Sequence, residues 1–414
     1  MLNIRKTIAG LAIFSLPLGS VFAQEEEDRL TFSAKGFVDT YHAVRAHDSC
    51  DLMSSRSRVR LEGRVARGGG SAFLSANATY NALLPEQTGV FLREAFVEGE
   101  CKGWNFRLGR QIVTWGVADG LQLTDVVSPM DYTEFLAQDY DDIRVPVNAV
   151  RLGTVSEHFR SEVLWVPVPE FFVLPTDPGN PWNIKMNGLP CQFVEQRPSK
   201  LLENGDFGAR LCFNYSGLDF SLAALRTFNK MPAFQVLGLT PEKQLLLAAE
   251  YRRLTMLGAD FSFPLDKFVI RGEVAEYLGA LQTCSVSGKA PLSRNQTQML
   301  VGVDWYPGNY WTLMLQYNHS VVDNYSPTIS AYRNQGMVVL NISKELCHNL
   351  LKLNTFGRID CANNGGFFFR FNADYLLTDQ LTLSAGYDWF RAESGTFSMY
   401  DSNDECYVKG KFSF

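Results

Sequence analysis

Apolar and polar side chains alternate in segment after segment of this 414-residue chain, and this pattern constrains the fold more than any other feature. Within residues 367–375, for example, apolar and aromatic side chains alternate with Arg370, Asn372 and Asp374. A two-residue period sends successive side chains to opposite faces of a strand, whereas a helix repeats about every 3.6 residues. The chain is therefore expected to form many strands, each with one apolar and one polar face.

Eighteen segments of this kind predict an all-β fold, a transmembrane antiparallel β-barrel whose strands turn their apolar faces to lipid. An even number brings both ends of the barrel to one side; 16 strands is the alternative count, since 247–263 and 349–356 are the weakest assignments. The predicted strands are residues 30–45, 55–67, 71–82, 90–100, 104–115, 147–155, 159–168, 207–214, 219–228, 247–263, 267–279, 296–306, 310–319, 335–344, 349–356, 365–377, 379–391 and 403–414.

The connections between these strands alternate between short and long, as is typical of outer-membrane barrels. Gly68-Gly69-Gly70, for instance, has the composition of a tight turn. The longest connections are 116–146, 168–206 and 229–246. A connection of about 30 residues can fold into a barrel, and loops of that length are usually functional or disordered. We expect 116–146 to fold inward and to narrow the lumen.

The start of the chain predicts export. Arg5 and Lys6 precede a short apolar run, and Val21-Phe22-Ala23 has the small residues of a cleavage site, so 1–23 is expected to be a signal peptide. No later segment offers about 18 consecutive apolar residues, the length of a membrane-spanning helix. The predicted location is the outer membrane of a Gram-negative bacterium.

After cleavage, residues 24–29 would form a short acidic periplasmic segment and residues 30–414 the outer-membrane barrel. The expected partners are outer-membrane lipid and the barrel-insertion machinery, which would recognise the terminal Phe414. The full chain has 38 basic and 44 acidic residues; without Arg5 and Lys6 the balance is 36 against 44, a net charge near −8. This acidic balance argues against a nucleic-acid partner.

A ladder of charged side chains runs along the second predicted strand. Arg56, Arg58, Arg60, Glu62 and Arg64 occupy alternate positions and therefore share one face. An arginine on the lipid face costs about 2–4 kcal/mol at the middle of the bilayer. The ladder is therefore expected to face the lumen.

Two interpretations of the ladder remain open. Rings of arginine favour anions in pores, so the ladder could be a rail that attracts an anionic solute. Alternatively, Glu94 and Glu98 on a nearby strand could pair with the arginines, and the network would be structural. Four other arginines are expected to attract anions in the lumen, with one more acid as a partner: Arg107, Arg210, Arg271 and Arg370, and Glu273.

The eight cysteines are expected to form disulfides, because export places them in an oxidising compartment. Cys50 and Cys361 fall in outer connections, and Cys406 lies at the outer start of the last strand. Barrel closure brings the first and last hairpins together, so Cys50–Cys406 or Cys361–Cys406 are plausible pairs.

A stretch within 90–155 carries a resemblance to a known family. Arg93-Glu94-Ala95, Gly109-Arg110-Gln111 followed by Trp115-Gly116, and Asp125-Val126-Val127-Ser128-Pro129 look like a bacterial outer-membrane barrel family of unknown function. The stretch is more distantly similar to alginate-export and porin barrels. The resemblance implies an 18-stranded, pore-like barrel and names no substrate. Alginate-export barrels line their pores with arginines, as the ladder would, but they do not share the cysteine number.

The sequence offers little for catalysis. No cluster has zinc-ligand spacing, and His319 and Ser320 would point to opposite faces. The acids of 116–146 match no EF-hand spacing, so an ordinary solvated acidic loop is expected in preference to a calcium site. We therefore predict no enzyme activity, no cofactor and no metal.

These features predict a porin-like outer-membrane channel for passive or facilitated diffusion of a small polar, anionic solute. The alternative is a non-conducting outer-membrane barrel that acts in assembly or lipid handling. The oligomeric state is not determined by the sequence.

Overall fold

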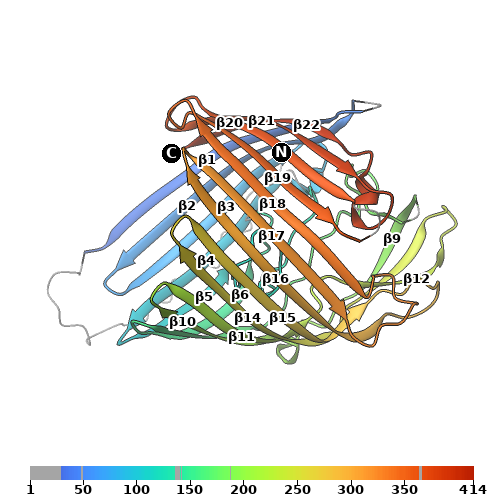
Figure 1. Ribbon diagram of the computed structural model, residues 1–414, viewed down its shortest axis with the longest axis horizontal. Helices are drawn as coiled ribbons and strands as arrows, with labels where there is room; N and C mark the ends of the chain where they lie inside the picture. The colour runs from blue at the N-terminus through green and yellow to red at the C-terminus, as the bar shows by residue number, and fades with distance from the viewer. Residues whose placement is uncertain (1–28, 48–49, 136–139, 141, 187, 363–365) are drawn as a thin grey trace, which may run out of the picture.

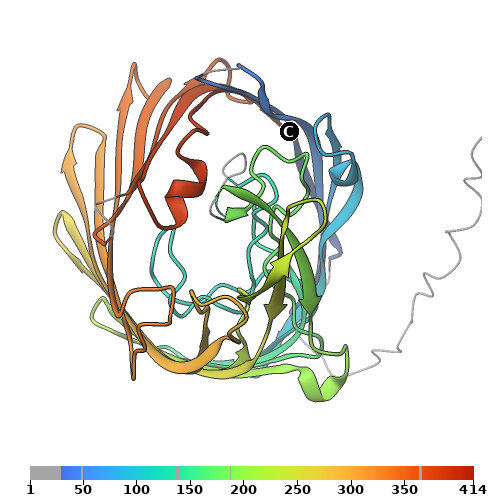
Figure 2. The same cartoon turned by 90° about the vertical axis from the view of Figure 1, so that its right-hand side faces the viewer.

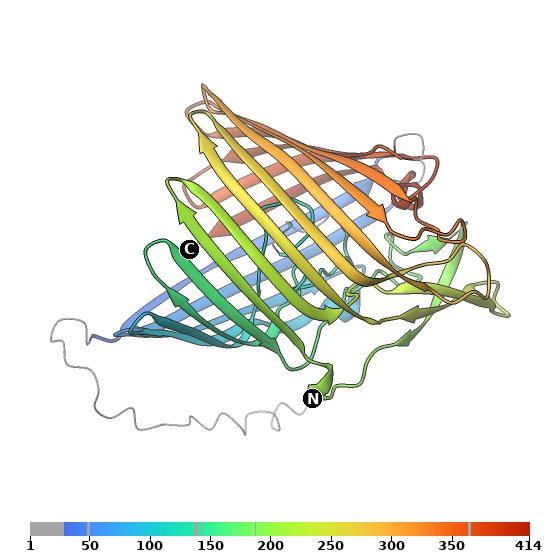
Figure 3. The ribbon, with the colours of Figure 1, turned by 60° about the horizontal axis from the view of Figure 1, so that its bottom comes forward.

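The computed structural model describes residues 29–47, 50–135, 140, 142–186, 188–362 and 366–414. The predicted signal peptide and nearly all of segment 24–29 lie outside these residues. The described chain forms a closed, antiparallel barrel of 18 strands whose ribbons cross the wall obliquely (Figures 1 and 3). The described residues contain no helix that is long and apolar enough to cross a membrane.

Each wall strand pairs with its neighbours along the chain, and β1 pairs with β22 to close the ring. The predicted count of 18 is confirmed. The wall strands are β1 (Thr31–Arg45), β2 (Leu52–Arg67), β3 (Gly70–Asn81), β4 (Gly89–Cys101), β5 (Trp104–Gln111), β6 (Val147–Val155), β7 (Phe159–Val166), β10 (Asp206–Tyr215), β11 (Leu218–Phe228), β14 (Arg253–Leu265), β15 (Phe268–Gln282), β16 (Leu292–Gly308), β17 (Trp311–Val322), β18 (Asn334–Leu346), β19 (Leu351–Asp360), β20 (Phe367–Leu376), β21 (Leu381–Arg391) and β22 (Glu405–Ser413).

The closing seam depends on a glycine in β1. The backbone N–H groups of Phe414 and Gly36 each donate to the other residue's carbonyl, at 2.9 and 2.8 Å. A Cβ on Gly36 would lie 2.8 Å from the Phe414 ring and 2.5 Å from the carbonyl oxygen of Arg60. Only a residue without a side chain leaves room for the terminal phenylalanine to pack across the seam.

The outer face of the wall is apolar and accessible, which is the reverse of a soluble protein. Leu61, Leu74, Val163 and Val301 are each more than half exposed, while Arg56 on the other face of β2 is 3% exposed. Transmembrane barrels present this apolar band to lipid. The alternation seen in the sequence therefore separates a lipid face from a lumen face.

A second, four-stranded sheet stands on the end of the barrel that carries the long connections (Figure 1). It consists of β8 (Lys185–Met186), β9 (Leu189–Gln196), β12 (Ala233–Leu239) and β13 (Leu245–Glu250). The prediction of one wall strand over 247–263 was wrong. The run Leu245–Glu250 alternates like a wall strand but pairs with β9 and β12, and the wall resumes at Arg253.

The prediction of a strand over 104–115 was also too long. The β5 ladder ends at Gln111, because the next backbone N–H groups bond to side chains instead of to β6. Ile112 donates to the Glu94 carboxylate at 2.9 Å, and Val113 donates to the Ser128 hydroxyl at 2.9 Å. The connection that follows, drawn in teal, lies inside the ring of strands together with the short 3-10 helix η3 (Thr396–Tyr400) (Figure 2).

Candidate functional site

The connection 112–146, called the inner loop below, is attached to one side of the lumen by apolar packing. Val113, Trp115, Leu123 and Val127 of the loop are at most 3% exposed. They form one cluster with buried lumen-facing residues of the wall: Val147, Ala149, Leu164, Val166, Ala223, Leu225, Leu254, Met256, Ala275, Tyr277, Ala280 and Leu300. This sector of the lumen is therefore packed with side chains, whereas the sequence predicted a polar lining throughout.

Glu273 of β15 fixes a turn of the inner loop. Its carboxylate accepts hydrogen bonds from the backbone N–H groups of Val117, Ala118 and Thr124 at 2.9, 3.1 and 2.6 Å, and from the Thr124 hydroxyl at 2.8 Å. Gly116 has φ of +83°, and a Cβ there would lie 2.7 Å from the carboxylate. Sequence analysis assigned Glu273 to the arginine network, but the described contacts bind it to the loop.

The arginine ladder binds the opposite side of the inner loop. Arg56 forms an ion pair with Glu134 at 2.7 Å. Asp142 lies between two further rungs, 2.9 Å from Arg58 and 2.7 Å from Arg60. We name these contacts the arginine clamp: Arg56, Arg58 and Arg60 with Glu134 and Asp142.

The clamp changes the interpretation of the ladder. Arg56, Arg58 and Arg60 are 3%, 5% and 7% exposed, and Arg58 also pairs with Asp39 of β1 at 2.6 Å. Glu134 and Asp142 of the inner loop are thus partners of the wall, whereas the sequence suggested an ordinary solvated acidic loop. Because the loop covers these three arginines, the buried pairs favour the structural interpretation of the ladder.

Asp142 of the clamp keeps its charge over the whole physiological range. Burial raises the pKa of Asp142, but the guanidinium groups of Arg58 and Arg60 outweigh it and hold that pKa below its ordinary value. A carboxylate with a lowered pKa contributes stability that is lost only as the pH falls through that lowered value. Mild acidification therefore leaves this attachment intact.

The remaining predicted site residues are mostly held by other side chains. Glu98 bridges two of the predicted arginines, and Glu94 accepts the loop N–H described above instead of an arginine. The other pairs are Arg64 with Glu98, Arg107 with Glu98 at 2.6 Å, Glu62 with Lys35 at 3.3 Å, Arg210 with Asp260 at 3.1 Å, Arg271 with Asp304 at 2.5 Å and Asp119 at 2.6 Å, and Arg370 with Asp388 at 2.6 Å.

A cavity of about 1480 Å³ remains between the inner loop and the wall, lined mainly by β17 to β22 and also by Tyr41 of β1, Ser262 of β14 and Arg271 of β15. It reaches from Phe234, among the long connections, to Thr382 and Lys411 near the short-turn ends of β21 and β22. Six basic and four acidic side chains line it: Arg144, Arg271, Arg358, Arg370, Lys409 and Lys411, and Asp119, Asp125, Asp360 and Asp374.

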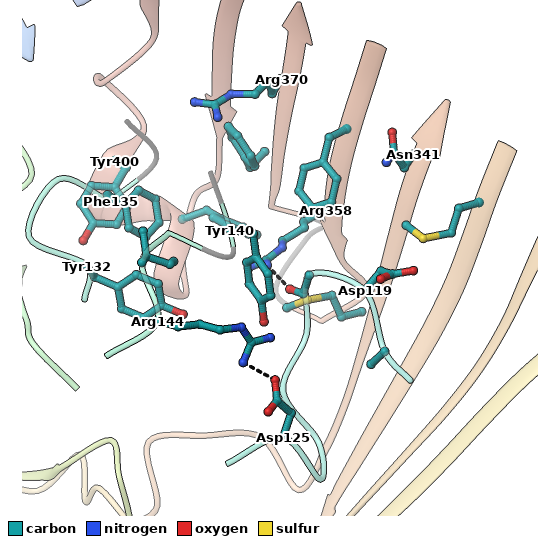
Figure 4. A pocket seen from close by; sticks show the side chains of 18 of the residues that line it. Asp119, Asp125, Tyr132, Phe135, Tyr140, Arg144, Asn341, Arg358, Arg370 and Tyr400 are labelled. Carbon is teal, nitrogen blue, oxygen red and sulfur yellow. Dashed lines mark hydrogen bonds and ion pairs between the residues drawn. The ribbon is translucent and has the colours of Figure 1, made fainter. Parts of the chain in front are cut away.

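Arg358 is a cavity residue that sequence analysis missed, because the predicted strand 349–356 ended before it. Its guanidinium donates to the carbonyl oxygen of Gly120 and lies 5.7 Å from the centroid of the Phe356 ring. Within the described ranges no carboxylate forms an ion pair with Arg358. Figure 4 shows Arg358 reaching from the wall toward Tyr140 of the inner loop. The alternation Lys352, Asn354, Phe356 would have predicted its direction.

The predicted disulfides are not formed. All eight cysteines lie in the described ranges and all are free thiols, including Cys50, Cys361 and Cys406. Cys406 is exposed and stands two residues from Val408, so both side chains project from the lipid face of β22. The described residues also contain no group of three or more His, Cys, Asp or Glu side chains that could hold a metal ion.

Asp125 of the inner loop predicts a pH-dependent charge in the cavity. Burial raises its pKa to about 6, although Arg144 pairs with it and Trp115 donates a backbone hydrogen bond at 3.0 Å. Below that pKa the acid is neutral and Arg144 keeps its charge, so the cavity gains positive charge. We expect the anion-to-cation permeability ratio to rise when the pH is lowered from about 7.5 to about 5.

Reversal potentials in a salt gradient at the two pH values would test this expectation. Asp125→Asn is the matched variant, since it fixes the site in its neutral form. Its permeability ratio at high pH should equal that of the wild type at low pH, and its own pH dependence should be smaller. An unchanged pH dependence in Asp125→Asn would assign the effect to other groups.

Comparisons with known proteins agree with this geometry. OccAB1 of Acinetobacter baumannii is 9% identical, with a TM-score of 0.54 over 92% of this chain and 96% of that chain. OccD3 (OpdP) of Pseudomonas aeruginosa is 10% identical, with a TM-score of 0.54 over 92% of this chain and 91% of that chain. OpdL of the same organism is 9% identical, with a TM-score of 0.53 over 92% and 98%. At these identities the likeness shows the fold alone, that of outer-membrane porins.

No curated protein matches the sequence. The family model with the description "Protein of unknown function (DUF1302)" matches residues 29–342, which is well over half of the chain. The resemblance found in the sequence is therefore confirmed at the level of the family. The chain belongs to this family of unknown function, and it has the 18-stranded barrel fold of outer-membrane porins.

Proposed function

We propose that the chain is a channel of the Gram-negative outer membrane for passive or facilitated diffusion of a small polar, anionic solute. The observation that carries the proposal is the cavity of about 1480 Å³, which extends along the barrel between the inner loop and β17 to β22. A polar lumen inside a lipid-facing barrel is the usual design of an outer-membrane channel. The inner loop would set its width.

The charge around the cavity supports a moderate preference for anions. Arg144, Arg271 and Arg370 are paired with carboxylates, so their fields are largely neutralised. Arg358 and Lys411 form no ion pair with any carboxylate of the described residues, and both line the cavity. The selectivity would therefore depend on this side of the lumen and not on the ladder of β2.

The test is single-channel conductance of the refolded protein in a planar bilayer, with the reversal potential in a salt gradient. We expect a stable current that prefers anions. Arg358→Gln should lower the anion-to-cation permeability ratio, because it removes a lining charge without breaking an ion pair. The matched control is Arg252→Gln, whose side chain is 51% exposed and pairs with Glu250 away from the cavity.

Equal permeability ratios for the wild type, Arg358→Gln and Arg252→Gln would contradict anion attraction by Arg358. A cation-selective wild type would contradict the proposed solute class. The absence of any current from a protein shown to be folded by its heat-modifiable gel mobility would contradict the channel itself.

A non-conducting barrel is the second candidate. The packed sector between the inner loop and β6 to β16 favours it, because buried side chains of these wall strands form one cluster with the loop. Such a barrel would act in assembly or in lipid handling. A missing current, together with an intact fold, would favour this candidate.

The proposal also includes the export signal, the surrounding lipid and the machinery that inserts the barrel. Residues 1–23 would be a signal peptide, and outer-membrane lipid would surround the exposed apolar side chains. Phe414 is 53% exposed at the seam and would be available to the insertion machinery before closure. No enzyme activity and no cofactor are proposed.

A further inference from the structure

Methionine side chains gather around the cavity. The chain has ten methionines, and five of them line this one space: Met186, Met231, Met314, Met337 and Met399. Methionine is flexible and polarisable, and proteins use it heavily on surfaces that accept apolar groups of different shapes. Half of the methionines at a single cavity indicates an apolar contact surface for a solute.

Three of these methionines come from separate long connections. Met186 lies in β8, Met231 precedes β12, and Met399 lies in η3. Met231 is 41% exposed. With Leu174 and Ile184 they make the cavity apolar at the end where the long connections meet. Met186 and Met399 are half-buried and pack against neighbouring apolar clusters. Apolar side chains that stay accessible on connections carry a cost in water, so a patch built from three connections marks a contact site.

The cavity becomes polar and basic further in. Arg358 of β19 pairs with Val339 of β18 across the ladder. Met337 lies two residues from Val339, which is about 7 Å along β18. Asn341 lies two residues further, and its side-chain oxygen has no hydrogen-bond partner among the described residues. Lys411 lies deeper, near the end of β22. A solute that enters from the long connections therefore meets apolar side chains first and cationic ones next.

We infer that the cavity takes amphipathic organic anions. In such an anion a carboxylate is attached to an apolar body, which is an aromatic ring or a short aliphatic chain. The apolar body contacts Met186, Met231 and Met399 at the end of the cavity where the long connections meet, here called the mouth. The carboxylate contacts Arg358. The inference rests on the proposed channel function and names the class of its solute. A strongly hydrated anion of similar size has the charge but gains nothing from the methionines.

The experiment compares sodium phenylacetate with sodium gluconate, a polar carboxylate, as probes in a planar bilayer. Each probe is added on one side to a channel that conducts chloride. Phenylacetate should interrupt the chloride current in a concentration-dependent way, and gluconate should do so only at about tenfold higher concentration.

The variant Met186→Ser/Met231→Ser/Met399→Ser should weaken the phenylacetate effect about tenfold, and the channel should still conduct chloride with a preference for anions. The matched control is Leu189→Ser/Leu237→Ser/Leu239→Ser. It replaces three exposed apolar residues of the four-stranded sheet, in β9 and β12, that do not line the cavity. This control should behave like the wild type. Arg358→Gln should weaken the phenylacetate effect and reduce anion preference together.

The outcomes separate the two proposals. Equal effects of phenylacetate and gluconate on a stable anion current would overturn the inference and leave the channel function intact. The same would follow if the methionine variant and its control did not differ. No current from folded protein would overturn the channel function, and the inference with it.

Discussion

Replacing Glu134 and Asp142 together with alanine should raise the single-channel conductance several-fold and make the current fluctuate. These two carboxylates are the loop side of the arginine clamp, 2.7 Å from Arg56 and 2.7 Å from Arg60. Breaking a buried ion pair by removing one partner typically costs about 3–5 kcal/mol. A loss of about 3 kcal/mol shifts an attachment equilibrium roughly a hundredfold. The second half of the inner loop would therefore leave the wall for much of the time.

The fold should survive this change. The first half of the loop keeps its apolar cluster, and the wall strands keep every backbone hydrogen bond. The matched control is Glu86→Ala/Asp323→Ala, which removes two carboxylates from exposed connections without touching the clamp. Both variants should show wild-type heat-modifiable mobility, and only the first should show the larger current. Equal conductance in the two variants would mean that the inner loop does not limit the channel.

The same variant decides between the two interpretations of the ladder. If the arginines attracted solute directly, uncovering them would increase anion preference more than conductance. If they mainly hold the loop, as the buried pairs indicate, conductance should increase in larger proportion. The reciprocal variant Arg58→Gln/Arg60→Gln should also raise conductance, because Asp142 loses its two nearer partners and keeps only Arg93, at 3.6 Å.

The wall strands were predictable because the alternation of apolar and polar residues within each strand shows which side chains face lipid and which face the lumen. Leu61 and Arg60 are adjacent, and the cost of an arginine in lipid is enough to orient both. The splitting of 247–263 was not predictable in this way. Leu245–Glu250 alternates as a wall strand does, and only its long-range pairing with β9 takes it out of the wall.

The candidate site was predictable only in part, because its contacts join distant segments. The alternation placed Arg58 and Glu273 in the lumen, but no local sequence pattern identifies their partners in the inner loop. Asp142 lies 84 residues from Arg58, and Thr124 lies 149 residues from Glu273. A carboxylate in a long acidic connection is ordinarily solvated, so only the folded loop shows that Asp142 is an anchor. The methionines of the mouth were missed for the same reason.

Replacing Glu273 with alanine should detach the turn of the inner loop that lines the cavity. The N–H groups of Val117, Ala118 and Thr124 would lose their shared acceptor. Each unsatisfied buried donor costs about 1–3 kcal/mol, so the turn should move into the cavity or away from it to reach water. We expect either a larger, fluctuating conductance or frequent closures, in place of one steady level.

Two variants of the same strand make this prediction specific. Glu273→Gln keeps one side-chain oxygen as an acceptor for the loop and should lie between the wild type and Glu273→Ala. Glu276→Ala removes a carboxylate from the other face of β15, where Glu276 accepts a hydrogen bond from Thr297 at 2.6 Å, and should keep the steady level. A steady wild-type current in Glu273→Ala would show that the apolar cluster alone holds the first half of the loop. The arginine clamp would then be the main polar attachment that sets the width of the channel.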